Sequence, residues 1–348
     1  MSVIKLGNRL IGESNPTLII AEIGINHQGD INIAKQLIDK AHDCGADAVK
    51  FQKRSISRIL TKKGLVQPYL NRNSFGATYG EHKKALELSE KDYHLLMNYS
   101  EKRDLIFCAS GWDEESIDFL DSIGMIFFKM ASADLTNFPL LEHTAAKGKP
   151  MILSTGMASI DMVKKAYSLV SGINDQVALL QCTSTYPSSF DEIHLNVLST
   201  YLKKFPDAVV GYSGHELGIV IPPVAVALGA RIIERHFTLD RTMKGGDHAA
   251  SLEPQGFSKM IRDIRHIERA LGSDIKEVQK SELPIFKKLS KSIVLLSAVK
   301  KGKEITRDIL TTKGPGDGIS PMRISEVIGS IASRDIDEDE ILRDGDML

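Results

Sequence analysis

The chain contains eight short apolar runs, and a segment long enough for a helix follows each of them. Continuous apolar runs of this length are typical of strands buried on both faces, as in a parallel sheet. Eight strands that alternate with helices predict a closed (β/α)8 barrel, the TIM barrel. The runs are TLIIAEIG (17–24), DAVKFQ (47–52), LIFCAS (105–110), IFFKMAS (126–132), PMILSTG (150–156), VALLQCTS (177–184), AVVGYS (208–213) and RIIERHFT (231–238).

Nearly all of these runs end on a polar or charged residue. In a (β/α)8 barrel the carboxyl ends of the strands meet at one mouth, which is where active sites lie. The pattern therefore predicts one cavity lined by side chains from distant parts of the chain. These are Glu22, Lys50, Gln52, Ser110, Lys129, Ser132, Ser184, Ser213, His215 and His236.

The segments between the runs carry residues that start and stop helices. Side chains able to cap a helix N-terminus precede several segments, and glycine, which tolerates a left-handed conformation, ends several. The expected helices cover 31–45, 90–104, 113–124, 138–148, 159–172 and 252–272. The candidate N-caps are Asp30, Ser89, Asp113 and Ser159, and the C-terminal glycines are Gly45, Gly124, Gly148 and Gly272.

The length of the chain predicts more than one domain. At 348 residues it exceeds a single barrel of about 250 residues. We expect a catalytic barrel over 1–272, with a hairpin over 1–16, then a charged linker over 273–286 and a small domain over 287–348. Residues 53–88 form a long polar segment after the second run, and such loops usually serve the site of a barrel.

Charge, apolar runs and cysteine content indicate which partners and which cellular compartment to expect. The formal net charge is −1, so no overall field draws the chain to nucleic acid or to an anionic membrane. There is neither an apolar run of about 20 residues nor a signal-peptide core. The three cysteines form no disulfide framework, and Cys108 and Cys182 are interpreted as small buried hydrophobes. We therefore expect a cytoplasmic protein.

Two histidines suggest a metal site. His215 follows the seventh predicted strand and His236 lies near the end of the eighth, and neighbouring strands bring such residues within reach of one ion. With no thiolate ligand in the pattern, Mn²⁺, or else Mg²⁺ or Co²⁺, fits better than structural zinc. The alternative is a pair of histidines with ordinary hydrogen bonds.

Two lysines stand at the ends of otherwise apolar strands, Lys50 and Lys129. Because a buried ammonium is unfavourable unless an anion meets it, they suggest an anionic substrate held with the help of serine hydroxyls. Two alternatives stay open. The lysines could form salt bridges with Glu22, Asp134 or Glu234, or one of them could form a Schiff base with a carbonyl substrate.

The sequence resembles the sialic acid synthase family over essentially its whole length. The barrel motifs that carry the resemblance are AEIGINHQGD (21–30), GADAVKFQ (45–52), FKMASAD (128–134), LSTGM (153–157), QCTSTYP (181–187), GYSGH (211–215) and ERHFTLD (234–240). The C-terminal segment, with SKSIV, KGKEI and KGPGDGI, is similar to the family's antifreeze-like (SAF) domain.

The resemblance implies a metal-dependent condensation of phosphoenolpyruvate (PEP) with N-acetylmannosamine or its 6-phosphate. The products would be N-acetylneuraminate or its 9-phosphate, and phosphate, released by cleavage of the C–O bond of PEP. It further implies a homodimer in which the small domain of one subunit covers the barrel mouth of the other. By the same resemblance, Lys129, Ser110 and Ser132 would bind the carboxylate of PEP, Lys50, Ser184 and Ser213 its phosphate, His215 and His236 the metal, and Asp247 the sugar. From their places at the strand ends and in the loops of the mouth, we also expect Glu22, Gln52 and Tyr186 to contact the sugar, and Glu22 to act in catalysis together with the two histidines.

The identity of the acceptor sugar stays open. The stretches 78–89 and 244–254 resemble the animal members of the family, which favours a 6-phosphorylated acceptor. The loop at 313–316 reads Lys-Gly-Pro-Gly and lacks the arginine that bacterial members place there to contact the N-acyl group. Alternatives are a synthase for legionaminic, pseudaminic or deaminated neuraminic acid, and a carbohydrate- or ice-binding protein. Candidate phosphate partners, which could equally form a solvated face, are Lys62, Lys63, Arg72 and Lys83.

Overall fold

The structure is a computed structural model that describes residues 2–13 and 15–348. Met1 and Ser14, which fall within the segment expected to form a hairpin, lie outside the described residues. The contacts within the chain divide it into two compact units, 1–272 and 273–348.

Within the described residues, the first unit contains eight parallel strands in the order β5-β4-β3-β10-β9-β8-β7-β6. The strands at the two ends of this order, β5 and β6, lie against each other, which nearly closes the barrel. All eight predicted strands are confirmed. Their bounds are β3 Leu18–Gly24, β4 Ala48–Lys53, β5 Ile106–Gly111, β6 Phe128–Met130, β7 Met151–Ser154, β8 Val177–Cys182, β9 Val209–Gly214 and β10 Ile232–His236.

The strands are buried along nearly their whole length, as their continuous apolar runs predict. Every residue of β3 and β8 is buried. The register then fixes which strand-end side chains become neighbours. His236 on β10 pairs with Glu22 on β3, which pairs in turn with Lys50 on β4. A second row of paired positions links Cys182 on β8, Ser213 on β9 and Glu234 on β10.

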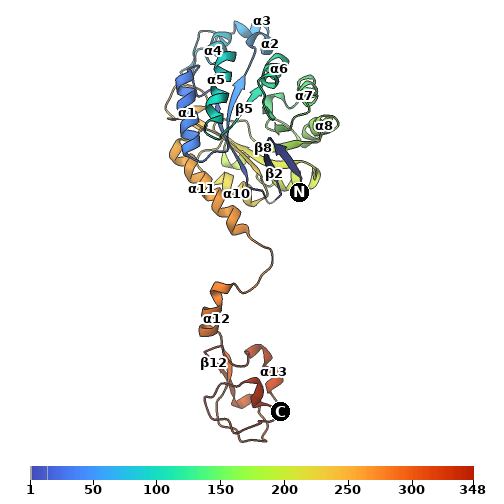
Figure 1. The fold of residues 1–348 in the computed structure, drawn as a ribbon, viewed down its shortest axis with the longest axis vertical. Helices are drawn as coiled ribbons and strands as arrows, with labels where there is room; N and C mark the ends of the chain where they lie inside the picture. The colour runs from blue at the N-terminus through green and yellow to red at the C-terminus, as the bar shows by residue number, and fades with distance from the viewer. Residues whose placement is uncertain (1, 14) are drawn as a thin grey trace. The chain divides into compact units, whose positions relative to one another are not determined.

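Helices surround the strands of this unit (Figure 1). The four predicted N-caps accept hydrogen bonds from backbone amides of the first turn, and the four predicted C-terminal glycines have positive φ. The pattern of apolar and polar residues does not predict helices α9 and α10. Helix α10 reads IPPVAVA and is too short and uniformly apolar to show a helical period. The bounds are α1 Ile31–Asp43, α5 Glu90–Glu101, α6 Glu114–Ser122, α7 Phe138–Ala145, α8 Ile160–Ser171, α9 Val197–Lys204, α10 Ile221–Ala227 and α11 Pro254–Leu271, with 3-10 turns η1 Ser132–Asp134, η2 Phe190–Glu192 and η3 His248–Ala250.

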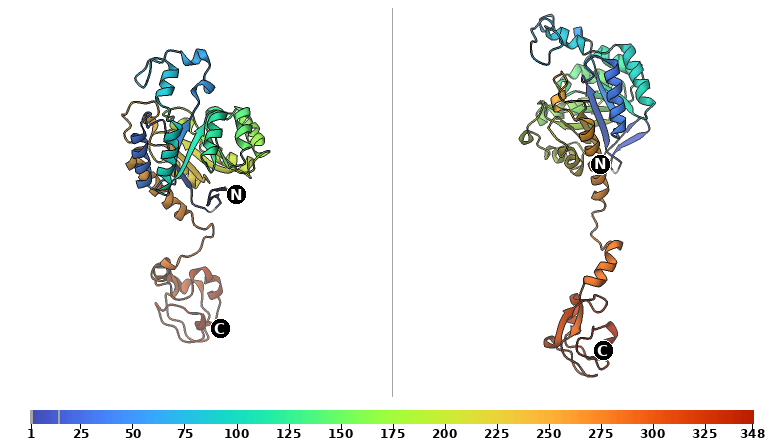
Figure 2. Two further views of the ribbon diagram at one scale, coloured as in Figure 1. Left: turned by 45° about the horizontal axis from the view of Figure 1, so that its top comes forward. Right: turned by 90° about the vertical axis from the view of Figure 1, so that its left-hand side faces the viewer.

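The long segment 53–88 and the N-terminal hairpin lie at opposite ends of the barrel, as both views of Figure 2 show. The hairpin pairs β1 Val3–Leu6 with β2 Arg9–Gly12. It is held to the amino ends of the strands by an ion pair of 2.5 Å between Arg9 and Asp47. The long segment follows β4 at the mouth and folds into α2 Ile56–Ile59, α3 Lys62–Leu65 and α4 Tyr79–Ala85.

The second unit has a small hydrophobic core of its own, formed by residues such as Ile293, Leu295 and Val327. Helix α12 and a 3-10 turn occupy part of the segment expected to be a linker, 273–286, and their side chains are exposed. The elements are η4 Lys280–Glu282, α12 Leu283–Leu289, β11 Ser292–Leu295, η5 Arg307–Ile309, β12 Leu310–Lys313, η6 Pro321–Arg323, α13 Ile324–Val327 and η7 Asp344–Asp346, with β11 and β12 antiparallel.

A search of the described residues for membrane-spanning helices found none of sufficient length and apolar character.

Candidate active site

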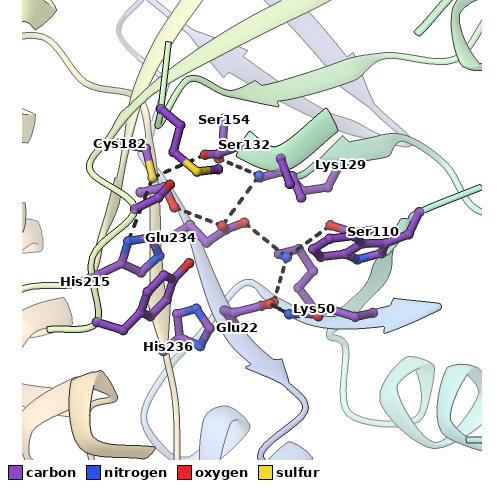
Figure 3. A pocket seen from close by; sticks show the side chains of 18 residues that line it. Glu22, Lys50, Ser110, Lys129, Ser132, Ser154, Cys182, His215, Glu234 and His236 are labelled. Carbon is purple, nitrogen blue, oxygen red and sulfur yellow. Dashed lines mark hydrogen bonds and ion pairs between the residues drawn. The ribbon is translucent and has the colours of Figure 1, made fainter. Parts of the chain in front are cut away.

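A cavity of about 260 Å³ opens among the carboxyl ends of the barrel strands. It is lined by all ten residues that the strand ends point to, and by Tyr186. Figure 3 shows that the labelled side chains converge from both sides of this cavity. Asp247 is not part of the lining, but its Oδ2 lies 3.8 Å from Nδ1 of His236, so it is adjacent to the cavity.

Four buried charged side chains form the floor of the cavity, and we call Lys50, Lys129, Glu22 and Glu234 the inner charge cluster. The Nζ atom of Lys50 lies 2.8 Å from Oε2 of Glu22 and 3.9 Å from Oε2 of Glu234. The Nζ atom of Lys129 lies 3.6 Å from Oε1 of Glu234. Both lysines therefore have carboxylate partners in the free protein, and Asp134 is not one of them, since its Oδ1 accepts from Asn137 at 3.2 Å.

The shifts in pKa within this cluster follow from burial and from these partners. Burial raises the pKa of Glu22, although Lys50 opposes this effect. Burial also acts to raise the pKa of Glu234, but Lys129 and Lys50 outweigh it and hold that pKa below its ordinary value. Burial lowers the pKa of Lys129, whereas Glu22 and Glu234 overcome burial and raise the pKa of Lys50.

Hydroxyl groups stand beside both lysines. Ser110 Oγ lies 3.3 Å from Nζ of Lys50, although the family resemblance associates Ser110 with Lys129. Lys129 instead donates a hydrogen bond of 2.6 Å to Ser154 Oγ. The remaining predicted hydroxyls also face the cavity: Ser132 accepts from the amide of Gly156 at 3.0 Å, Ser213 donates to Glu234 at 3.0 Å, and the buried Ser184 Oγ has no hydrogen-bond partner within the described chain.

The two histidines lie together on the other side of the cavity, with ring centroids 5.3 Å apart (Figure 3). Nδ1 of His215 is 2.7 Å from the carbonyl oxygen of Thr183, which leaves Nε2 free. Nδ1 of His236 is buried and has no hydrogen-bond partner among the described residues, and burial lowers the pKa of this ring to about 3. Burial acts to lower the pKa of His215, but its contact with Cys182 outweighs burial and raises that pKa. Two adjacent imidazoles, one of them oriented by a backbone carbonyl, are suited to bind a metal in their deprotonated form.

The coordination of a metal at the two histidines depends on how many other protein side chains could contribute to it. The residues described contain no cluster of three or more His, Cys, Asp and Glu side chains arranged to hold an ion. The remaining coordination positions of an ion at His215 and His236 would then be available to water and substrate oxygens, as a catalytic site requires.

An ion pair behind the histidines holds them in place. Glu216 and Arg235 are the chain neighbours of His215 and His236, and both side chains are fully buried. Arg235 donates to Oε1 of Glu216 at 2.5 Å and to the Glu216 carbonyl at 2.5 Å, while the hydroxyl of Tyr212 donates to Oε2 at 2.7 Å. This network joins β10 to the loop after β9 and fixes the spacing of the two imidazoles.

Tyr186 closes one side of the cavity over these rings. Its ring lies 4.0 Å from the ring of His215 and meets the ring of His236 edge-on at 5.6 Å, between centroids. The side chain is 45% exposed. It therefore forms part of the wall between the histidines and solvent.

Several residues that line the cavity are not among those that the sequence predicted. Glu234 was considered only as an alternative partner of the lysines, and Ser154 and Trp112 were not considered. Cys182 is buried as expected, but it is more than a small hydrophobe, because its Sγ lies 3.6 Å from Ser132 Oγ and 3.9 Å from His215 Nδ1. Most of the missed residues stand two positions from a predicted one, and period-two alternation along a strand could have identified them.

Comparisons with known proteins identify the family of the chain. The profile of the NeuB family matches residues 37–276, and the profile of the SAF domain matches residues 290–348. The chain is 45% identical to the N-acetylneuraminate-9-phosphate synthase of Homo sapiens, over 96% of this chain and 93% of the human protein. It is 40% identical to the N,N'-diacetyllegionaminic acid synthase of Legionella pneumophila, over 93% of each chain.

A solved structure shows the same architecture. The N-acetylneuraminic acid (sialic acid) synthetase of Leptospira borgpetersenii superposes with a TM-score of 0.72 at 36% identity. The match covers 82% of this chain and 95% of the other. The chain therefore belongs to the NeuB family, and its C-terminal unit contains a SAF domain.

Proposed function

We propose that the protein is a sialic acid synthase that condenses PEP with N-acetylmannosamine or its 6-phosphate. The product is N-acetylneuraminate or its 9-phosphate, and inorganic phosphate is released. The observation that carries the proposal is the meeting of two buried lysines and two buried histidines in one cavity of the barrel mouth. The names and extent of the matched relatives support the same reaction.

The inner charge cluster and its hydroxyls are proposed to bind PEP. PEP carries up to three negative charges, and cations with fixed hydroxyl donors are the groups that bind such a ligand. Lys129 and Ser132 would bind the carboxylate, and Lys50, Ser184 and Ser213 the phosphate. Ser110 lies within reach of Lys50 and would lie between the two ends of the ligand.

His215 and His236 are proposed to hold a divalent metal ion, with Mn²⁺ favoured over Mg²⁺ and Co²⁺. The unpartnered nitrogen of His236 and the carbonyl-oriented ring of His215 support this assignment. When bound, the ion would supply Lewis-acid polarisation of the sugar aldehyde.

The side chains of the protein then position and stabilise the reacting groups. C3 of PEP bonds to the aldehyde carbon of the open-chain sugar, and the aldehyde oxygen takes up a proton to become a hydroxyl group. Water adds to C2 of PEP, and the bond between C2 and the bridging oxygen breaks, so that phosphate leaves and a ketone remains. Lys50 and Lys129 would stabilise the negative charge of PEP throughout, and Glu22 would bind sugar hydroxyls or orient the water.

We also propose that the protein acts in the cytoplasm as a homodimer, in which the SAF domain of one subunit covers the barrel mouth of the other. Met157 and Tyr186 at the mouth are 69% and 45% exposed in the single chain, and a covering domain would bury them. Exclusion of bulk water suits the reaction. Sedimentation velocity should give a dimer, and a monomer at assay concentration would contradict this part.

The test is a phosphate-release assay with PEP, Mn²⁺ and a panel of acceptors. The panel contains N-acetylmannosamine, its 6-phosphate, and the sugar precursors of legionaminic, pseudaminic and deaminated neuraminic acid. We expect release only with N-acetylmannosamine or its 6-phosphate, and PEP labelled with ¹⁸O at the bridging position should give labelled phosphate. Release with another precursor alone would reassign the substrate. No release with any acceptor would contradict the synthase, and trapping of pyruvate by borohydride would indicate a Schiff base instead.

A further inference from the structure

A second cavity adjoins the candidate active site. Its volume is about 610 Å³, and Tyr186 contributes to the lining of both cavities. Three cationic side chains also line it, and we call Arg72, Arg241 and Lys244 the rim cations. Arg72 comes from the long segment after β4, whereas Arg241 and Lys244 come from the loop after β10. The folded barrel thus brings together basic residues that are far apart in the sequence.

The rim cations are not neutralised by the protein. Lys244 lies with its Nζ 4.7 Å from the ring centroid of Phe75, and Arg241 donates to the carbonyl oxygen of Ala249 at 2.5 Å. Within residues 2–13 and 15–348, none of the three forms an ion pair with a carboxylate. Many exposed basic side chains elsewhere on the chain do have an acidic partner. The positive charge around this cavity is therefore available to an anion.

The loop that carries two of these cations is held in shape without any ligand. The Thr238 hydroxyl lies 2.7 Å from Nδ1 of His248, and Gln28 donates to the carbonyl oxygen of Lys244 at 2.6 Å. Gly245 has φ of +150°, and a Cβ at this position would lie 2.7 Å from the His248 ring. The tight packing of the loop requires glycine there, so the positions of its cations are built into the fold.

The loop also extends from the cationic cavity to the candidate metal ligands. Asp247, three residues beyond Lys244, reaches to 3.8 Å from His236. Because Tyr186 lines both cavities, a ligand with one end at the histidines can reach the second cavity past this side chain. A further cation in this region, Lys83, has its pKa lowered to about 8 by burial and by Arg54. Asp247 and Glu87 oppose this shift, so Lys83 lies within electrostatic range of the same loop.

We propose that the rim cations Arg72, Arg241 and Lys244 bind the phosphoryl group of a 6-phosphorylated acceptor sugar, and that they select this acceptor over the free sugar. The inference rests on the proposed function and assigns the acceptor class of that same site. Guanidinium groups match phosphate oxygens in pairs, and an ammonium adds a point charge, so the set suits a phosphate dianion. Lys62 and Lys63 do not line this cavity.

The test compares two acceptors with the full-length protein, PEP and Mn²⁺. The measured quantity is the preference, defined as kcat/KM for N-acetylmannosamine 6-phosphate divided by kcat/KM for N-acetylmannosamine. In the double variant Arg72→Gln/Lys244→Gln we expect the preference to fall about 100-fold, since two charge-assisted contacts are lost. The matched control is Lys62→Gln/Lys63→Gln, which removes two exposed cations from α3 and should keep the wild-type preference.

The outcomes separate this inference from the proposed function. The wild-type protein could turn over one of the two acceptors while Arg72→Gln/Lys244→Gln keeps the wild-type preference. The assignment of the phosphoryl site would then be wrong, and the proposed synthase function would be unaffected. If both double variants lose the preference equally, the effect is one of general surface charge, and the assignment is also wrong. If the wild-type protein releases no phosphate with either acceptor, the proposed function fails, and the inference fails with it.

Discussion

The inner charge cluster and the rim cations are two groups of basic side chains in opposite environments. Lys50 and Lys129 are buried and lie against carboxylates, whereas the rim cations are exposed and have none. A buried ammonium must be compensated in the free protein, because leaving it alone in a medium of low dielectric constant is very unfavourable. An exposed ammonium is compensated by water. The rim cations can therefore remain without a carboxylate partner until a ligand binds.

The net charge of the inner charge cluster affects how strongly PEP can bind. Two ammonium groups and two carboxylates leave the inner charge cluster close to neutral, so a trianion that enters finds little net positive charge. A divalent ion at His215 and His236 would supply the missing charge. The stability and activity of the protein are thus expected to depend on each member of the inner charge cluster. Substitutions of the rim cations are expected to change acceptor preference and to leave the stability of the fold unaltered.

The largest effect is expected from loss of a candidate metal ligand. His236→Ala should lower kcat by at least about 1,000-fold and abolish the dependence of turnover on Mn²⁺. Titration of the metal by calorimetry should show weaker binding. His266→Ala, which alters an exposed histidine on α11, is the matched control and should behave as the wild-type protein does. Retention of metal-dependent turnover in His236→Ala would rule out the assignment of this ligand.

The next effect concerns stability and the ion pair behind the histidines. Glu216→Gln leaves Arg235 buried without its carboxylate partner, and we expect the free energy of unfolding of the barrel to fall by about 3 kcal/mol. Urea denaturation followed by circular dichroism measures it. The control is Glu115→Gln, which removes an exposed partner of Arg58 and should change stability by less than about 0.5 kcal/mol. Equal effects in the two variants would contradict the contrast between buried and exposed charge.

A somewhat smaller effect is expected on the donor substrate. Lys129→Ala removes one of the two cations that face Glu234, and it should raise KM for PEP by roughly 100-fold, with a smaller change in kcat. Steady-state kinetics at saturating acceptor measure both constants. Lys165→Ala, on the exposed face of α8, should leave KM unchanged. An unaltered KM in Lys129→Ala would mean that this lysine serves the fold and does not bind PEP.

The smallest effect is expected for Lys83, whose burial is intermediate between that of the inner charge cluster and that of the rim cations. Lys83 is partly buried, and its pKa is lowered to about 8, so its charge destabilises the folded protein below that pH. As the pH rises from 8 to about 10.5, the folded protein loses this proton before the unfolded chain does, and stability is gained. Lys83→Met should therefore be about 1 kcal/mol more stable than the wild-type protein at pH 7, with the difference shrinking above pH 8. Urea midpoints across this range measure it, and a constant difference would contradict the shift.

The barrel and most of the buried site could be predicted from the sequence because both depend on local pattern. Continuous apolar runs specify the strands, and the residues that end them reach one mouth. Alternation could have extended the prediction, since Glu234 and Cys182 stand two residues before His236 and Ser184 and line the same cavity. Helix α10 could not be assigned in this way, because its uniformly apolar sequence has no helical period.

The rim could not be predicted in the same way. Arg72 lies in the sequence far from Arg241 and Lys244, and no periodicity relates them. Only the folded loops bring them to one cavity, and of the four basic residues suggested by sequence, Arg72 alone lines it. Loop geometry depends on contacts such as that between Gln28 and the Lys244 carbonyl, which no local pattern reveals.

The origin of the rim cations in two connecting segments has an implication for how such enzymes diversify. The residues proposed to bind PEP lie on or next to the barrel strands, where a replacement disturbs buried neighbours. The rim cations, which are proposed to select the sugar, lie in the two surface segments after β4 and β10. These segments can be exchanged without altering the hydrogen-bonded strands of the barrel. Grafting these connections between relatives offers a direct route to new acceptors that leaves the barrel strands unchanged.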